Sequence, residues 1–181
     1  FSLDAAAPVE QKGVVTGKLA NGTVGASMPA NQMVTLRIFD NFQEIPSMTV
    51  AVKPDGSYEF DNLDLPDGRA FIVTARYNNV TYTSDVASVQ AGKNSYDLPI
   101  NVFETTNDPA GITFDRLHIV LDFQNGAVKV GELVAISNKS DRAYMGPANA
   151  GGNVLEINLP AGYTNLTFQD GTLGDRYKQT A

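Results

Sequence analysis

Acidic side chains are most concentrated in the stretch DGSYEFDNLDLPDG at residues 55–68. Carboxylates this close together are typical ligands of Ca²⁺, which takes about six to eight oxygen atoms. Four side chains could form such an oxygen cluster: Asp61, Asn62, Asp64 and Asp67. Their spacing departs from that of the EF-hand loop, which also requires a Glu at its last position. A calcium site is therefore one interpretation of this stretch.

Tight turns explain the same stretch without a metal ion. In Pro54-Asp55-Gly56, proline presets φ, aspartate hydrogen bonds to nearby backbone, and glycine takes the positive φ. The tripeptide Pro-Asp-Gly recurs at residues 66–68. Glu59 falls at an outward position of the short strand between the turns. We expect turns here, with calcium as the alternative and no other cofactor.

Residues suited to catalysis are sparse elsewhere. The single histidine, His118, lies on the polar side of an alternating segment, where we expect it to be solvated. The chain has no G-x-S-x-G sequence that would present a serine nucleophile. A carboxylate pair such as Asp115 and Asp122 could hydrolyse glycosides if it flanked a cleft, but the chain has no Trp to stack on a sugar. We therefore expect a non-catalytic protein.

Composition restricts the partners and the compartment. The formal charge of −7 and the scattering of the 13 Lys and Arg residues argue against nucleic acid, which requires a basic patch. The absence of Cys excludes disulfides and thiolate metal sites. No apolar run is long enough for membrane insertion. The chain begins at Phe1 rather than Met, which we interpret as the processed end of an exported protein on the cell surface or outside the cell.

Short alternating segments separated by Gly, Pro, Asn and Asp indicate an all-β fold. The predicted strands are 14–19, 33–39, 48–53, 57–60, 70–77, 80–85, 96–103, 114–123, 128–137, 153–159 and 165–168.

Two hairpins can be predicted with their register. The Asn78-Asn79 turn keeps the apolar residues on either side of it on one face, because Asn tolerates positive φ. The turn at Asn125-Gly126 sets Asp122 opposite Lys129 on the solvent face. Beyond Gly131 the alternation slips by one residue, which predicts a β-bulge.

The polar segment ETTNDPAG at 104–111 is the best domain boundary. The seven predicted strands within 13–103 suffice for a closed sandwich. The four within 112–181 are too few to enclose a second core. We therefore predict two β-sandwich domains in tandem, Ig-like or transthyretin-like, the second of them incomplete and completed by a strand from a neighbour.

Three segments carry a resemblance: GVVTGKL at 13–19, PDGSYEF at 54–60 and LPDGRAFIVTA at 65–75. Together they resemble the carboxypeptidase regulatory-like, or transthyretin-like, β-sandwich, which is also similar to the B-type repeats of bacterial surface adhesins. Phe71 stands where that family often has Tyr, and the insertion at 31–47 is longer than usual. The resemblance implies an exported accessory module without catalytic residues. The segment from FDRLHIVLDF to FQDGTLGDRY is similar to segments that follow this module in some bacterial surface proteins.

These features favour a structural subunit that forms a homopolymer, such as a surface filament. The N-terminal extension FSLDAAAPVEQK at 1–12 is the candidate donor strand, with Phe1, Leu3 and Val9 as its apolar contacts. Donation from head to tail would propagate into a filament. Two alternatives remain: an accessory or binding module of a larger exported or membrane-anchored enzyme or electron-transfer protein, or a carbohydrate-binding domain. For the latter the stacking candidates are Tyr144, Tyr163 and Tyr177.

Four N-x-S/T sequons fall in predicted turns or near strand ends, at Asn21, Asn79, Asn138 and Asn165. Each is a candidate glycan attachment site in an organism that glycosylates exported proteins.

Overall fold

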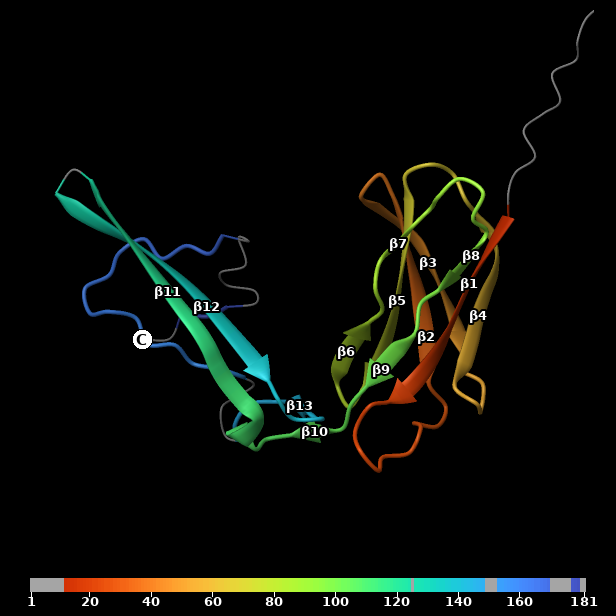
Figure 1. Cartoon of the computed structure of the whole chain (residues 1–181), viewed down its shortest axis with the longest axis horizontal. Coiled ribbons are helices and arrows are strands. Elements are labelled where there is room, and N and C mark those ends of the chain that lie inside the picture. Colours follow the sequence, from red (N-terminus) through yellow and green to blue (C-terminus); the bar gives the residue numbers. More distant parts are fainter. Residues whose placement is uncertain (1–11, 125, 149–152, 170–176, 180–181) are drawn as a thin grey trace, which may run out of the picture.

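The structure is a computed structural model that describes residues 12–124, 126–148, 153–169 and 177–179 (Figure 1). The chain is all-β, as predicted, with one short 3-10 helix, η1 (Pro109–Gly111). The first nine strands are β1 (Lys12–Asn21), β2 (Met33–Asp40), β3 (Gln43–Ala51), β4 (Ser57–Asp64), β5 (Arg69–Tyr77), β6 (Val80–Thr83), β7 (Ala87–Ser88), β8 (Ser95–Asp97) and β9 (Ile100–Val102).

These nine strands form a sandwich of two sheets. One sheet has the order β4-β1-β8, with β9 also paired to β1, and the other has the order β3-β2-β5-β6, with β7 paired to β5. Alternate residues of each strand point between the sheets, where Val15 and Leu19 from one sheet meet Leu36, Phe71 and Val73 from the other. All five side chains are almost completely buried, so this half of the chain encloses its own core.

Two prolines explain where the strands differ from the prediction. The predicted strand 96–103 is divided into β8 and β9 at Leu98-Pro99, because proline cannot donate to a ladder. Strand β3 begins at Gln43, well before the predicted residue 48. Its alternation is interrupted by a bulge at Pro46, which is tolerated because β3 lies at the edge of its sheet.

The predicted hairpin between β5 and β6 is confirmed. Tyr77 pairs with Val80 and Ala75 with Tyr82, and Asn78 and Asn79 both have positive φ, of 48° and 62°. This is the geometry that a two-residue hairpin turn requires.

The second half consists mainly of one long hairpin (Figure 1). Its strands are β10 (Thr105–Thr106), β11 (Ile112–Gln124), β12 (Ala127–Asn138) and β13 (Ala143–Tyr144). β11 pairs with β12 and β10 with β13, so both sheets are two-stranded among the described residues. This agrees with the prediction that this half has too few strands to enclose a core.

The predicted register of the long hairpin is confirmed, with Asp122 opposite Lys129. The predicted bulge beyond Gly131 is wrong. Pairing continues without a break through this point, and the irregularity lies between Phe114 and Arg116 of β11. The apolar–polar alternation of the sequence slips after Gly131 because Leu133 is apolar, although its side chain points to the side opposite that of Val130.

The predicted strands 153–159 and 165–168 are wrong, since the described residues 153–169 are irregular. Val154, Leu155 and Ile157 are 41–51% exposed, and Gly162 and Asn165 have positive φ, which interrupts extended structure. Apolar alternation alone does not make a strand, because the backbone also needs a neighbouring ladder.

Candidate functional site

The acidic stretch forms the predicted turns. Gly56 has φ +86°, and Oδ1 of Asp55 accepts hydrogen bonds from the backbone N–H of Ser57 at 3.0 Å and from its hydroxyl at 2.7 Å. The Ser57 hydroxyl is the main reason why the pKa of Asp55 lies below its ordinary value. At the second turn, Gly68 has φ +82°. Asp55 is therefore explained by its hydrogen bonds within the first turn, and Asp67 lies in a second turn of the predicted kind.

The four candidate calcium ligands are not gathered into a cluster. Asn62 has φ +54° and lies in a bulge of β4, where the pairing shifts opposite residues 13–15 of β1. The carboxylate of Asp64 pairs with the ammonium group of Lys12, which lowers the pKa of Asp64. Asp61 and Asp67 are exposed. In the part of the chain that the structure describes, no three His, Asp or Glu side chains are placed to hold a metal ion.

The other titratable candidates lie on β11. His118 is exposed and pairs across the hairpin with Leu133. Asp115 and Asp122 are seven residues apart on one strand, about 23 Å at the usual rise. Glycosidase carboxylates lie roughly 5–9.5 Å apart, so this pair does not have that geometry. Asp115 instead accepts hydrogen bonds from the hydroxyls of Thr113 and Ser137.

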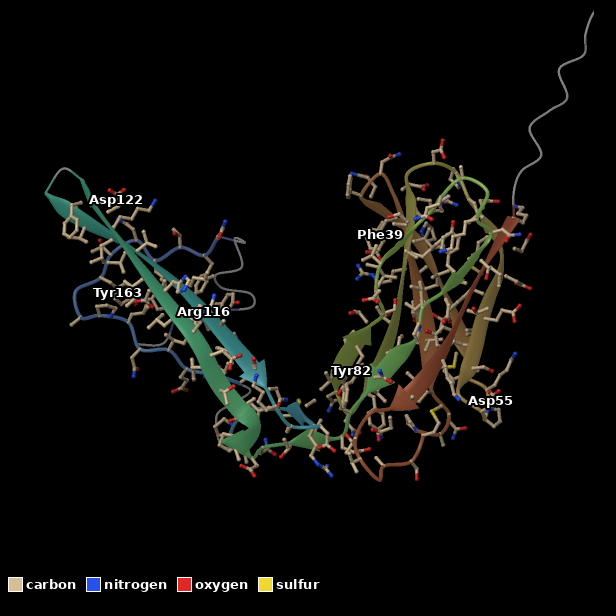
Figure 2. The ribbon with its side chains drawn as sticks, viewed as in Figure 1. Phe39, Asp55, Tyr82, Arg116, Asp122 and Tyr163 are labelled. Carbon is tan, nitrogen blue, oxygen red and sulfur yellow. The ribbon has the colours of Figure 1, made fainter. Side chains whose placement is uncertain are left out.

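The most unusual surface is one face of the β11–β12 hairpin, which we call the ribbon (Figure 2). Cross-strand pairing places seven apolar side chains on one side, which we call the apolar face: Leu117, Ile119, Leu121, Phe123, Val128, Val130 and Val134. All except Val134, which is half-buried, are 47–73% exposed. The opposite side carries Arg116 and Asp122, labelled in Figure 2, together with His118 and Lys129.

A row of exposed apolar residues this long is uncommon on a soluble β-protein and marks an interaction surface. The N-terminal sandwich has the same alternation but buries its apolar side. The ribbon alternates in the same way, and no second sheet of described residues covers it. The ribbon therefore resembles one sheet of a β-sandwich, with an apolar side that no second sheet of described residues covers.

A polar network connects the two halves through Glu104. Its Oε1 accepts hydrogen bonds from the hydroxyl of Tyr77 at 2.6 Å and from Nδ2 of Asn21 at 2.9 Å. Its Oε2 accepts from Nδ2 of Asn78 at 3.1 Å. These donors, led by Tyr77, hold the pKa of Glu104 below its ordinary value. The segment predicted as a linker thus begins with a residue held by the sandwich.

Thr23 extends this network to the second half. It is 3% exposed, and its hydroxyl accepts from the backbone N–H of Glu104 at 2.9 Å and donates to the backbone carbonyl of Asp141 at 2.7 Å. The carboxylate of Asp141 accepts from the backbone N–H of Val24 at 2.8 Å, and the N–H of Ala143 donates to the carbonyl of Glu104 at 2.8 Å. We call the hydrogen bonds made by Glu104, Thr23 and Asp141 together the junction.

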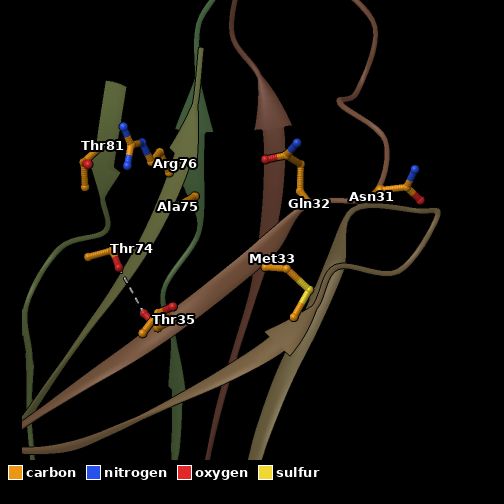
Figure 3. A pocket seen from close by; sticks show the side chains of 8 residues that line it. All are labelled: Asn31, Gln32, Met33, Thr35, Thr74, Ala75, Arg76 and Thr81. Carbon is orange, nitrogen blue, oxygen red and sulfur yellow. Dashed lines mark hydrogen bonds between the residues drawn. The ribbon is translucent and has the colours of Figure 1, made fainter. Parts of the chain in front are cut away.

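A shallow hollow of about 480 Å³ lies over β2, β5 and β6 (Figure 3). Thr35, Thr74 and Thr83 occupy one row across these strands, and Thr74 donates a 3.4 Å hydrogen bond to the carbonyl of Thr35. The lining residues are Asn31, Gln32, Met33, Thr35, Thr74, Ala75, Arg76 and Thr81. They offer hydroxyl, amide and guanidinium groups, which suit hydrogen bonding to a polar ligand rather than acid–base chemistry.

The candidate glycan sites differ in their surroundings. The amide groups of Asn21 and Asn138 are both engaged, Asn21 with Ser27 and Glu104 and Asn138 with Ser140 and Arg142. Asn79 and Asn165 are exposed on turns with positive φ.

The remaining candidates are scattered or outside the described residues. Tyr144 is half-buried in β13, Tyr163 is 39% exposed, and Tyr177 stacks on Phe168 with ring centroids 4.2 Å apart. The candidate donor residues Phe1, Leu3 and Val9 lie outside the described residues.

Sequence reasoning missed the junction and the hollow. Glu104 belongs to a polar Thr-rich segment that resembles any loop, and its partners are 26 to 83 positions away. The hollow is signalled only by threonines on the outward positions of neighbouring strands.

No protein-family model matches this chain, and no curated protein matches it. Solved structures similar to it include a 9R-lipoxygenase from Cyanothece PCC8801, at 14% identity and a TM-score of 0.34 over 57% of this chain and 18% of that chain. S.CueP matches at 14% identity and a TM-score of 0.34 over 52% of this chain and 64% of that chain. A single B repeat unit (B1) of the collagen-binding surface protein CNA of Staphylococcus aureus matches at 15% identity and a TM-score of 0.33, over 88% of this chain and 93% of that chain.

The first two matches cover less than two thirds of their structures. All three TM-scores are below 0.5, so these matches assign no function to this chain. Among the described residues there is no helix with the length and hydropathy needed to cross a bilayer.

Proposed function

We propose that this chain is a non-catalytic extracellular structural subunit that assembles with copies of itself. In this proposal the N-terminal segment of one copy adds a strand to the ribbon of the next, and repetition of this head-to-tail contact makes a surface filament. The observation that carries the proposal is the ribbon itself. Its strands have 13 and 12 residues, and each pairs only with the other among the described strands.

Two long strand edges of this kind attract further strands. Among the described strands, neither edge of the ribbon is paired with a third strand, and exposed edges are the usual sites of strand addition. Lys12 already belongs to β1, where it pairs with Asp64. The donor is therefore confined to residues 1–11, which include Phe1, Leu3 and Val9.

Deletion of residues 1–11 tests the donor. Light scattering of the full chain should detect species larger than a dimer, and their fraction should rise with protein concentration. The deletion variant should retain the melting temperature of the sandwich, because β1 is intact, and should lose these larger species. Larger species that persist in the deletion variant would refute strand donation by this segment.

A second candidate, an accessory module of a larger exported protein, is favoured by the self-contained core of the sandwich. In that case a partner segment of different sequence completes the ribbon. A full chain that stays monomeric up to about 100 µM, a range in which specific interfaces are normally occupied, would favour this candidate over the filament.

A further inference from the structure

We infer that the apolar face of the ribbon packs against the same face of a second copy, forming a two-layer, four-stranded sandwich. This inference rests on the proposed self-assembly and adds a second contact to it. Strand donation would use the edges of the ribbon, whereas this contact uses its face.

An added strand cannot cover the apolar face. A strand that pairs at an edge extends the sheet sideways by about 4.8 Å and lies in the same layer. Side chains such as Leu121 and Val130, which are opposite each other in the middle of the ribbon, would still point into solvent. A sheet with one apolar side is buried only by a second layer.

A second copy offers a layer of the right length and chemistry. The seven residues of the apolar face extend from the pair Leu117 and Val134 to the pair Phe123 and Val128 at the tip. The same face on another copy has the same length and is equally apolar. Two such faces can stack as the layers of a sandwich do, about 10 Å apart, with their side chains interdigitated.

The available area matches what a stable interface needs. The six most exposed side chains of the face, at 47–73%, offer on the order of 700 Å² per copy, against roughly 800 Å² per partner in a standard interface. The contact is isologous, because the same patch serves on both copies. It therefore closes as a dimer and needs no third copy.

The charged residues of the ribbon are arranged so that they stay in water. Arg116, Asp122 and Lys129 lie on the opposite side. The one charged residue on the apolar side is Glu132, which is exposed on β12 opposite Ile119. Glu132 lies between Val130 and Val134 on β12, and because the ribbon is only two strands wide, its side chain can bend outward past the edge of the stack.

Two neighbouring residues provide a matched pair of variants. Leu121 points to the apolar face and Val120 to the opposite face, with exposures of 52% and 66%. Leu121→Glu places a charge within the interface and should weaken the dimer at least about 100-fold, because a buried unpaired carboxylate is strongly unfavourable. Val120→Glu should change the dissociation constant less than about threefold. Sedimentation velocity of the full chain measures both, against a monomer of 19.4 kDa.

The absence of cysteine from the chain permits a second measurement. Single cysteines introduced by Leu121→Cys and Val120→Cys can form a disulfide only between copies. Oxidation should link Leu121→Cys dimers efficiently, whereas Val120→Cys should stay unlinked. Val130→Glu repeats the charge test from β12 if Leu121→Glu is poorly expressed.

The outcomes separate this inference from the proposed filament. Dimers that survive Leu121→Glu in the chain without residues 1–11 would overturn the face-to-face contact and leave strand donation standing. Dimers that persist without residues 1–11 and dissociate with Leu121→Glu would support the face-to-face contact. A full chain that forms these dimers and no larger species would in addition refute strand donation. Equal behaviour of Leu121→Glu and Val120→Glu, or a chain that is monomeric throughout, would overturn the dimer.

Discussion

The hydroxyl of Tyr77 donates a 2.6 Å hydrogen bond to the carboxylate of Glu104. This bond joins the last residue of β5 to the connection between the two halves. Asn21, at the end of β1, and Asn78, in the β5–β6 turn, donate to the same carboxylate. One side chain thus joins two separate parts of the sandwich, the end of β1 and the end of β5 with its turn, at the point where the chain leaves it. The first residue of the connection is therefore hydrogen-bonded to the sandwich on both of its carboxylate oxygens.

Glu104→Gln should lower the melting temperature at pH 7, because the amide is uncharged and weakens hydrogen bonds that the carboxylate accepts. The pKa of Glu104 is held below its ordinary 4.5, first by Tyr77. Its ionised form therefore stabilises the fold above that ordinary value, and this stabilisation is lost as the pH falls through the lowered pKa. Thermal unfolding at pH 7 and pH 3 should show a difference between wild type and variant that shrinks at pH 3.

The control for this prediction is Glu59→Gln on the exposed side of β4, which should leave the melting temperature unchanged at both pH values. A difference for Glu104→Gln that is as large at pH 3 as at pH 7 would show that its charge is not what stabilises the junction.

Gly17→Ala should destabilise the sandwich by about 1–3 kcal/mol, the usual cost of overpacking. A Cβ at this position would contact the ring of the buried Tyr58 and lie 2.6 Å from the carbonyl oxygen of Leu98. In contrast, a Cβ added at Gly131 on the ribbon would come no closer than 3.9 Å to Val120 on the paired strand. Gly131→Ala should change the unfolding free energy by less than about 0.5 kcal/mol. Urea denaturation of both variants measures this contrast, and equal effects would contradict it.

Glycans should occupy the four sequons unequally when the chain is secreted from a glycosylating host. Asn79 and Asn165 present exposed side chains, so we expect high occupancy there. The amide of Asn21 donates to Glu104 and Ser27, and a glycan would replace those bonds. Mass spectrometry of peptides should find Asn21 largely unmodified. Full occupancy of Asn21 without loss of stability would contradict the role that we assign to it in the junction.

Calcium should have little effect on this chain. Asp64 is paired with Lys12, and Asn62 adopts the bulge conformation of β4. We expect the melting temperatures in excess EDTA and in millimolar CaCl₂ to differ by less than about 1 °C. A stabilisation of about 1 kcal/mol would shift the melting temperature by more than this. A saturable rise in melting temperature that disappears in Asp61→Asn would show instead that the acidic stretch binds calcium.

Local signals predicted the turns and both hairpins. The geometry of a tight turn depends mainly on the residues within it. It could therefore be inferred from sequence for Asn78-Asn79, Asn125-Gly126 and Pro54-Asp55-Gly56. The register of the ribbon from the turn to Arg116 followed from the same logic, since one turn and a period of two determine these pairs, whereas the shift between Phe114 and Arg116 was not predicted.

Interactions between distant segments could not be predicted in this way. The alternation in 153–159 has the pattern of a strand, but whether a strand forms depends on an edge elsewhere in the chain or in another copy. The partners of Glu104 come from two separate segments, at Asn21 and at Tyr77-Asn78, and no residue next to Glu104 in the sequence indicates this role. The count of strands predicted that this half would not enclose a core, but it did not predict that one face of the ribbon would be exposed.

Parallel pairing of β1 with β9 has a mechanical consequence. The chain enters the sandwich at Lys12, at the start of β1, and leaves after Val102, at the end of β9, and these points lie at opposite ends of the two strands (Figure 1). Tension between them pulls the strands lengthwise past each other, so their hydrogen bonds are loaded together rather than opened one at a time. A domain connected in this manner resists stretching along the line that joins these two points.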